Sequence, residues 1–388
     1  MEDKGGNLAG HLVVDFSQIA AGPTCTMMLA DRGAEVIKIE PPGGDLGRTL
    51  GPPFIEGHGA IFMSLNRNKR SASLDLKKPE DLEVARRLVQ RADIVVESFR
   101  PGVMERLGLD YKTVARTNSR LVYCSISAYG QQGTLSGKPG VDGIVQATSG
   151  LVSTLGNGDG VPSKVQTPIV DMVTGFLSTT AILDALMARQ RTGRGAHLDI
   201  SMFAASVQLQ QVSLASYVAS GDLPRPSGSA APYSAPNEAF PSSDGWLMIA
   251  AYQPKRWTKL CEILGIPAAA TDARFATSDL RVANRPEMYA LVASKTQLWT
   301  REALLAALEE NDIICGPVNT YADVVETEIF ESMTSTFHHP EAGNFRFVAS
   351  LAPGLADSFR TTPTWPAPLL GQHTCEVVEL ANAGATTQ

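Results

Sequence analysis

The chain has 388 residues, 44% of them hydrophobic and 19% charged, so we expect a globular protein with more than one domain. A formal net charge of −7 without any basic run argues against a nucleic-acid partner. Five cysteines without paired spacing and six histidines without ligand spacing predict reduced thiols and no metal site.

The first two hundred residues alternate short apolar runs with helix-period runs, which predict buried strands and helices respectively. We expect helices at 24–31, 79–92 and 171–189. The expected strands are 12–16, 35–40, 71–76, 93–99, 121–127 and 197–202. Strands separated by helices favour an α/β fold with a parallel, helix-covered sheet.

The pattern changes after about residue 220. The stretch 222–236 contains four prolines together with serine and glycine, which is typical of a linker or an exposed loop. A strand at 245–252 and several helices are expected to follow, as in an α+β domain. We therefore divide the chain into the N-terminal part of a large domain, a small domain and a C-terminal segment, at 1–205, 225–325 and 330–388.

Nothing in the sequence predicts a membrane partner. The first ten residues lack the apolar core of a signal peptide, and we expect a cytoplasmic protein. The longest apolar stretch, 172–188, is interrupted by polar residues that include Thr174, Ser178 and Asp184. We expect it to be too short and too polar to span a bilayer.

The junction after the first expected strand has no glycine-rich phosphate loop. Residues 17–23 read SQIAAGP, with one glycine, so neither a GxGxxG fingerprint nor a Walker A motif is present. The chain also lacks the GxSxG elbow of α/β-hydrolases. The junction could direct backbone N–H groups toward a phosphate, or it could be a tight turn only.

Asp171 opens the expected helix 171–189. A carboxylate at a helix N-terminus faces unpaired N–H groups and the positive end of the macrodipole, so we expect it to be ionised. An ionised carboxylate can attack an activated acyl group. Aspartate is also a common helix cap, and this position alone does not decide between the two roles.

Seven short segments, none specific by itself, occur along the chain. They are 14–23, 30–40 (ADRGAEVIKIE), 66–71 (NRNKRS), 96–102 (VESFRPG), 192–195 (TGRG), 315–318 (CGPV) and 368–374 (PLLGQHT). In this order and spacing they resemble the family III CoA-transferases, the group of formyl-CoA and carnitine CoA-transferases, over nearly the whole chain.

The resemblance implies an enzyme that exchanges CoA between an acyl-CoA and a small carboxylic acid, without a tightly bound cofactor. The family's nucleophile falls on Asp171, which would form an aspartyl anhydride and then an enzyme–CoA thioester. Asp142 stands where relatives have an acidic residue near the reacting acyl group, although an aspartate between glycines is also typical of a turn.

The resemblance also implies a set of CoA contacts. They fall on Gln18, Ala20, Ala21, Leu74, Phe99, Val103, Arg106, Lys138 and Met202. Two departures leave the phosphate contacts open. Pro41 stands where some relatives have an arginine near the adenine, and Ser127 and Pro139 stand where some have lysine.

Two alternatives remain beside transfer: an α-methylacyl-CoA racemase, and a CoA-ester-binding protein without turnover. The racemases on this fold use a histidine and a glutamate, which fall on Val141 and Gln253, and neither side chain can take a proton at neutral pH. Gly228 is our candidate for the glycine of a pocket loop, with a plain linker glycine as the other interpretation.

The resemblance further implies an architecture. A Rossmann-like large domain would contain the N-terminal part and the returning C-terminal segment, and two chains would interlock as rings in a homodimer. Segments 66–71 and 124–131 look most similar to enzymes that move CoA from succinyl-CoA to dicarboxylic acids. Arg48 and Arg67 are candidates to pair with the free carboxylate of such a substrate, or they are surface charges.

Overall fold

The computed structural model describes residues 6–348 and 365–383, and the chain forms two compact units. The first unit contains the described residues of 1–152, 164–223 and 332–388, and the second contains 153–163 and 224–331. The large unit therefore continues past residue 205, because two further helices extend to Ser220. The segment 153–163 joins the small unit, where the Gly228 N–H donates to the carbonyl of Gly156 at 2.9 Å.

Six strands form the central sheet of the first unit, in the order β5-β2-β1-β6-β7-β8. All neighbouring pairs are parallel, which confirms the predicted parallel sheet. Counted along the chain this is the order 3-2-1-4-5-6 of Rossmann-type sheets. The strands are β1 (Leu12–Asp15), β2 (Glu35–Glu40), β5 (Lys69–Ser73), β6 (Ile94–Glu97), β7 (Val122–Ser127) and β8 (Ala196–Ser201).

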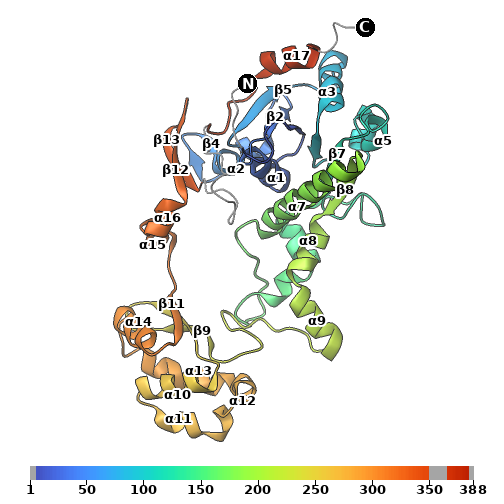
Figure 1. Ribbon diagram of the computed structural model, residues 1–388. Coiled ribbons are helices and arrows are strands. Elements are labelled where there is room, and N and C mark those ends of the chain that lie inside the picture. Colours follow the sequence, from blue (N-terminus) through green and yellow to red (C-terminus); the bar gives the residue numbers. More distant parts are fainter. Residues whose placement is uncertain (1–5, 349–364, 384–388) are drawn as a thin grey trace. The chain divides into compact units, whose positions relative to one another are not determined.

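Helices cover both faces of this sheet (Figure 1). Successive side chains of a strand point to opposite faces, so each strand contributes to two apolar cores. One core lies under α1 (Ala21–Ala30) and α7 (Ile169–Thr192). The other lies under α3 (Pro79–Arg91), α4 (Val103–Leu107), α5 (Tyr111–Val114) and α17 (Thr374–Asn382).

The long helix α7 packs against α1 at very short distance. A Cβ atom added to Gly175 would lie 2.7 Å from the Thr24 side chain and 2.8 Å from the carbonyl oxygen of Ala21, so only glycine fits there. With 24 residues, α7 is longer than the apolar stretch of the sequence. In the described ranges it is the one helix long and apolar enough to cross a membrane by length and composition, so our expectation on that point was wrong. A core helix of a soluble protein has the same properties.

Shorter elements complete the first unit. The C-terminal segment returns to the sheet edge, where the His373 N–H donates to the carbonyl of Ser71 at 2.9 Å. The strands here are β3 (Phe54–Ile55), β4 (His58–Gly59), β12 (Thr334–His339) and β13 (Gly343–Val348). The helices are η1 (Leu46–Arg48), α2 (Ala60–Leu65), α6 (Asp142–Thr148), α8 (Met202–Leu209) and α9 (Gln211–Ser220); η2 (Leu151–Thr154) and α16 (Glu328–Ser332) lie at the boundaries.

The second unit is an α+β domain with an antiparallel sheet of order β11-β10-β9. Arg281, fully buried beside Trp257, donates to three backbone carbonyls at 2.6–2.7 Å and so closes the connections around the core. The strands are β9 (Asn237–Pro241), β10 (Trp246–Ala250) and β11 (Ile314–Pro317). The helices are α10 (Pro254–Ile263), α11 (Pro267–Thr271), η3 (Ala273–Phe275), α12 (Ser278–Ala283), α13 (Arg285–Thr296), α14 (Arg301–Glu310) and α15 (Tyr321–Val325).

Candidate active site

Asp171 lies in the first turn of α7, which begins two residues earlier than predicted. Pro168 precedes the helix and provides no side-chain cap. The cap comes instead from Asp142, whose Oδ2 accepts from the backbone N–H groups of Val170 at 2.8 Å and Asp171 at 3.2 Å. Two carboxyl groups that are far apart in the sequence thus share one helix terminus.

Burial, and secondly the negative charge of Asp142, raise the pKa of Asp171 to about 7. This corrects the expectation that the helix N-terminus keeps Asp171 fully ionised. Two N–H groups of the first turn already donate to Asp142, so they are not free to stabilise a second carboxylate. Near neutral pH, Asp171 therefore exchanges between its acid and its carboxylate form.

Gln146 connects this pair of acids to the chain that leads into α7. Its amide nitrogen donates to Oδ1 of Asp142 and, at 3.1 Å, to the carbonyl of Val165. Its amide oxygen accepts from the Val165 N–H at 2.9 Å. Sequence reasoning missed Gln146, although its position four residues after Asp142 on one helix is a usable signal.

Gln18 and Phe99 follow β1 and β6, the two neighbouring strands at which the strand order reverses. The backbone N–H of Gln18 donates to the hydroxyl of Ser98 at 3.0 Å, so the two loops are joined. In open parallel sheets, ligands bind outside the carboxyl ends of the strands at this switch point. The structure thus brings together Gln18 and Phe99, two residues for which the resemblance implies contacts to CoA.

Buried charges fix the shape of the loop after β1. Lys38 donates to the carbonyl of Ser17 at 2.8 Å and forms an ion pair with Asp45 at 2.7 Å. Asp45 also accepts from the N–H of Ile19 at 3.0 Å, and Asp15 accepts from the N–H of Ser17 at 2.9 Å. Ile19 has a φ of +68°, a conformation that is rare for a β-branched residue and that the surrounding bonds must maintain.

The start of α7 lies beside this loop. Met172 packs with Ile19 and Ala20 in one small apolar cluster, and the hydroxyl of Thr24 lies 3.5 Å from its sulfur. Asp171 precedes Met172 directly. The candidate nucleophile and the predicted CoA loop therefore belong to one region of the large unit.

The other predicted CoA contacts differ in their exposure. Ala20 and Ala21 are buried at the start of α1, and Leu74 and Met202 are buried in apolar clusters, so these four residues support the surrounding structure. Three residues remain accessible: Val103 and Arg106 on α4, and Lys138 in the loop after β7.

Arg48 and Arg67 have protein partners, contrary to the role predicted for them. Arg48 binds the buried Glu40 through two nitrogens, at 2.7 and 2.8 Å, and donates to the carbonyl of Pro368 at 3.0 Å. Arg67 is buried and makes a two-pronged pair with Asp31. Both guanidinium groups are occupied, and we withdraw them as partners of a substrate carboxylate.

Gly228 lies in the second unit and has a φ of +61°, so a left-handed turn explains the glycine there. The two positions relevant to a racemase are helix caps: Val141 precedes α6 and is exposed, and Gln253 precedes α10. Among the described residues, no group of three or more histidine, cysteine or acidic side chains could hold a metal ion.

Comparisons with known proteins identify the family of the chain. The model of the family described as CoA-transferase family III matches residues 8–374. The succinate–glutarate CoA-transferase of Agrobacterium fabrum is 39% identical over 82% of this chain and 81% of its own length. The succinyl-CoA:mesaconate CoA-transferase of Haloarcula hispanica is 36% identical over 97% of this chain and 96% of its own.

Solved structures give the same result. A CAIB/BAIF family protein from Brucella suis superposes with a TM-score of 0.87 at 36% identity, covering 97% of this chain and 100% of the other. The chain thus combines a Rossmann-type sheet with Asp171 beside the switch point of that sheet. The family match assigns this fold to a known class of enzymes. The chain belongs to CoA-transferase family III and is an enzyme that transfers CoA.

Proposed function

We propose that the enzyme transfers CoA from succinyl-CoA to a small dicarboxylic acid, with Asp171 as the covalent carrier. The observation that carries the proposal is the half-buried Asp171, which lies next to the switch-point loop. The names of the Agrobacterium and Haloarcula relatives support succinyl-CoA as donor and a dicarboxylic acid as acceptor.

Four exchange steps account for the transfer. The Asp171 carboxylate attacks the thioester carbonyl, the C–S bond breaks, and CoA leaves as a thiolate with an aspartyl–succinyl anhydride remaining. The thiolate attacks the aspartyl carbonyl, succinate leaves, and an enzyme–CoA thioester forms. The acceptor carboxylate attacks this thioester and releases the thiolate. The thiolate then attacks the acceptor's acyl carbonyl and frees the Asp171 carboxylate.

A pKa of about 7 suits these steps. Ionised Asp171 is a more basic nucleophile than a carboxylate of ordinary pKa, yet a large fraction is ionised at neutral pH. The raised pKa also reflects a site of reduced solvation, in which the anhydride and the thioester meet less water. We place the CoA moiety along the switch-point loops, where Gln18, Phe99 and Arg106 lie on neighbouring segments.

Lys164 is the cation that best fits the free carboxylate of a dicarboxylate substrate. A side chain at Gly143, the neighbour of Asp142, would meet Cδ of Lys164 at 3.5 Å, so the lysine stem lies over the start of α6. The bonds between Gln146 and Val165 anchor the backbone next to it. Lys164 is exposed and forms no ion pair within the described part of the chain.

The test compares Lys164→Met and Lys164→Arg with the wild type, using succinyl-CoA as donor and glutarate or butyrate as acceptor. Mass spectrometry follows the new CoA esters. We expect Lys164→Met to raise the KM for glutarate about three- to fivefold with little change for butyrate, and Lys164→Arg to restore it, because an ion pair at an exposed side chain is worth up to about 1 kcal/mol. Arg191→Met, at the opposite end of α7, is the control and leaves both values unchanged. Equal effects on the two acids would refute the pairing.

We also propose a homodimer with interlocked chains. Large apolar side chains are exposed on α7 and α9, among them Phe176, Met187 and Val218, and such surfaces favour association. Two threaded chains can separate only after unfolding. Sedimentation at nanomolar concentration should therefore show a dimer, and a folded monomer would contradict the proposal.

A further inference from the structure

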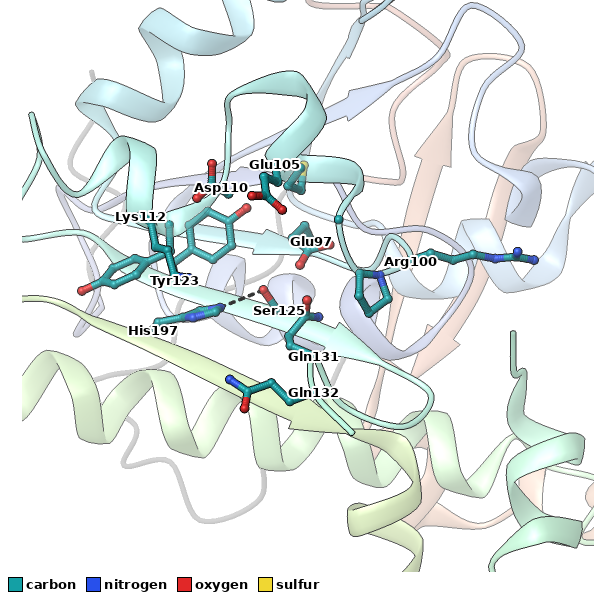
Figure 2. Close-up of a pocket in the computed structure, with 14 residues that line it drawn as sticks. Glu97, Arg100, Glu105, Asp110, Lys112, Tyr123, Ser125, Gln131, Gln132 and His197 are labelled. Carbon is teal, nitrogen blue, oxygen red and sulfur yellow. Dashed lines mark hydrogen bonds between the residues drawn. The ribbon is translucent and has the colours of Figure 1, made fainter. Parts of the chain in front are cut away.

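A cavity of about 300 Å³ lies between β6, β7 and β8 on one side and the helices α4 and α5 on the other (Figure 2). It opens on the face of the sheet opposite to α1 and α7, because its strand residues alternate with those of the α7 core. Its lining includes Glu97, Glu105, Tyr111, Ser125, Gln131 and His197.

Glu97 is the last residue of β6 and is only 4% exposed. Its Oε2 accepts from the backbone N–H of Phe99 at 2.9 Å, and this bond closes the turn that contains Ser98. The hydroxyl of Ser98 in turn accepts from the N–H of Gln18. The Glu97 carboxyl group thus stabilises the loop after β6 directly, and Ser98 alone connects it to the loop after β1.

Ser125 and His197 continue from Glu97 along the wall of the cavity. Ser125 lies opposite Glu97 on β7, and its hydroxyl lowers the pKa of the carboxyl group. The same hydroxyl lies 3.0 Å from Nε2 of His197, as Figure 2 shows. His197 stacks on Tyr111 with ring centroids 5.1 Å apart, which fixes the imidazole plane.

The surroundings of Glu97 disfavour its negative charge. Burial is the main cause that raises the pKa of Glu97 to about 7, and Asp199 on β8 adds to it. Within the described ranges no cation forms an ion pair with Glu97. The charged and titratable groups around the cavity are Arg100, Glu105, Asp110, Tyr111, Lys112, Tyr123, His197 and Asp199.

The Ser125 hydroxyl has one proton, so it allows two arrangements of hydrogen bonds. With Glu97 ionised, Ser125 donates to the carboxylate and His197 donates to Ser125. With Glu97 protonated, the acid donates to Ser125, and Ser125 donates to His197 in its other tautomer. The Phe99 N–H gains a charged acceptor in the first arrangement only, and hydrogen bonds to charged acceptors are stronger.

We propose that Glu97 is a positioning residue for the acyl-CoA site, whose ionised carboxylate holds the Phe99 turn in the form that binds CoA. Ser125 and His197 accommodate the change of charge through the cavity. The inference rests on the proposed use of Gln18 and Phe99 in CoA binding. It adds that CoA affinity depends on the ionisation of a group that touches neither substrate nor the reacting atoms.

The test measures the dissociation constant of CoA by calorimetry between pH 6 and pH 8. It uses the Asp171→Asn variant, because titration of Asp171 is then absent. The reference is the double variant Asp171→Asn/Glu97→Gln, whose pH dependence of CoA affinity is subtracted. After this subtraction, CoA should bind to Asp171→Asn about fivefold more tightly at pH 8 than at pH 6. The control Glu105→Gln removes a charge from the same cavity without contact to Phe99, and it should keep the full pH dependence.

Ser125→Ala provides a second test that keeps Glu97 in place. Loss of the hydroxyl that stabilises the carboxylate should move the midpoint of the pH dependence to higher pH. An unchanged pH dependence in Glu97→Gln, or an unchanged midpoint in Ser125→Ala, would overturn the inference while CoA binding itself persists. Absence of CoA binding in every variant would overturn the proposed function, and this inference with it.

Discussion

The carboxylate of Asp142 accepts a hydrogen bond from the backbone N–H of Asp171 at 3.2 Å, so both acids lie at the start of α7. The backbone N–H groups at the start of α7 donate to Asp142. Because they do not donate to the Asp171 side chain, its carboxylate is less stabilised. Asp142 therefore caps α7, and Asp171 has a pKa near neutral pH.

The first prediction concerns the pH dependence of turnover. Asp171 attacks only when ionised, and its pKa in the free enzyme is raised to about 7, so kcat/KM should rise with pH and level off above about 7. Asp142→Asn removes the neighbouring negative charge, which should lower that pKa and move the acid limb to lower pH. A kcat/KM profile from pH 5.5 to 9 measures both.

Gln146→Leu is the matched control, since it removes the contact to Asp142 but keeps the charge of Asp142. We expect it to lower activity without moving the acid limb to lower pH. If Gln146→Leu moved the acid limb as far as Asp142→Asn does, altered geometry and not the lost charge would explain the shift.

The second prediction concerns the stability of Asp171→Asn. A carboxyl group whose pKa is raised on folding contributes stability below its ordinary pKa of about 4, and that stability is lost as pH rises to about 7. The amide does not titrate. At pH 8 the variant should be more stable than the wild type by about 2–4 kcal/mol, because one pKa unit is worth about 1.4 kcal/mol. At pH 4 the two should be nearly equal in urea unfolding, and a variant less stable at pH 8 would contradict the buried, raised pKa.

The third prediction concerns the contact between α1 and α7. Gly175→Ala places a methyl group 2.7 Å from the Thr24 side chain and 2.8 Å from a backbone oxygen, which cannot yield easily. We expect a loss of about 1–3 kcal/mol in the free energy of unfolding. Thr180→Ala, at an exposed position of the same helix, should change it by less than about 0.5 kcal/mol. An alanine at 175 without cost would mean that the two helices are farther apart.

The fourth prediction separates structure from substrate binding at Arg67. Replacement by methionine removes the buried ion pair with Asp31, which keeps the hydrogen bond from Asn68, and should destabilise the protein by about 3 kcal/mol. KM values for dicarboxylates and monocarboxylates should change by the same factor. Arg87→Met removes an exposed pair with Glu83 and an exposed hydrogen bond to Asn382, and it should cost less than about 1 kcal/mol. A selective effect of Arg67→Met on dicarboxylates would restore Arg67 as a substrate contact.

Apolar runs predicted the central sheet well because all six strands are short and five of them are largely buried. The same logic could not find the partners of charged residues. Arg67 pairs with a residue 36 positions away, and Asp142 caps a helix 28 residues later, so only the folded chain shows these bonds. Glu97 was within reach of sequence reasoning, because a glutamate that ends the apolar run IVV is conspicuous in a buried strand.

The most direct test of the central claim is to trap the acyl-enzyme on Asp171. The wild-type protein is incubated with succinyl-CoA and hydroxylamine, and its peptides are mapped by mass spectrometry. Hydroxylamine attacks an activated aspartyl carbonyl, so we predict a hydroxamate on Asp171, accompanied by loss of activity and absent without succinyl-CoA. Asp171→Asn serves as the control. A modified residue elsewhere, or full activity of Asp171→Asn, would contradict the assignment of Asp171 as the carrier of CoA.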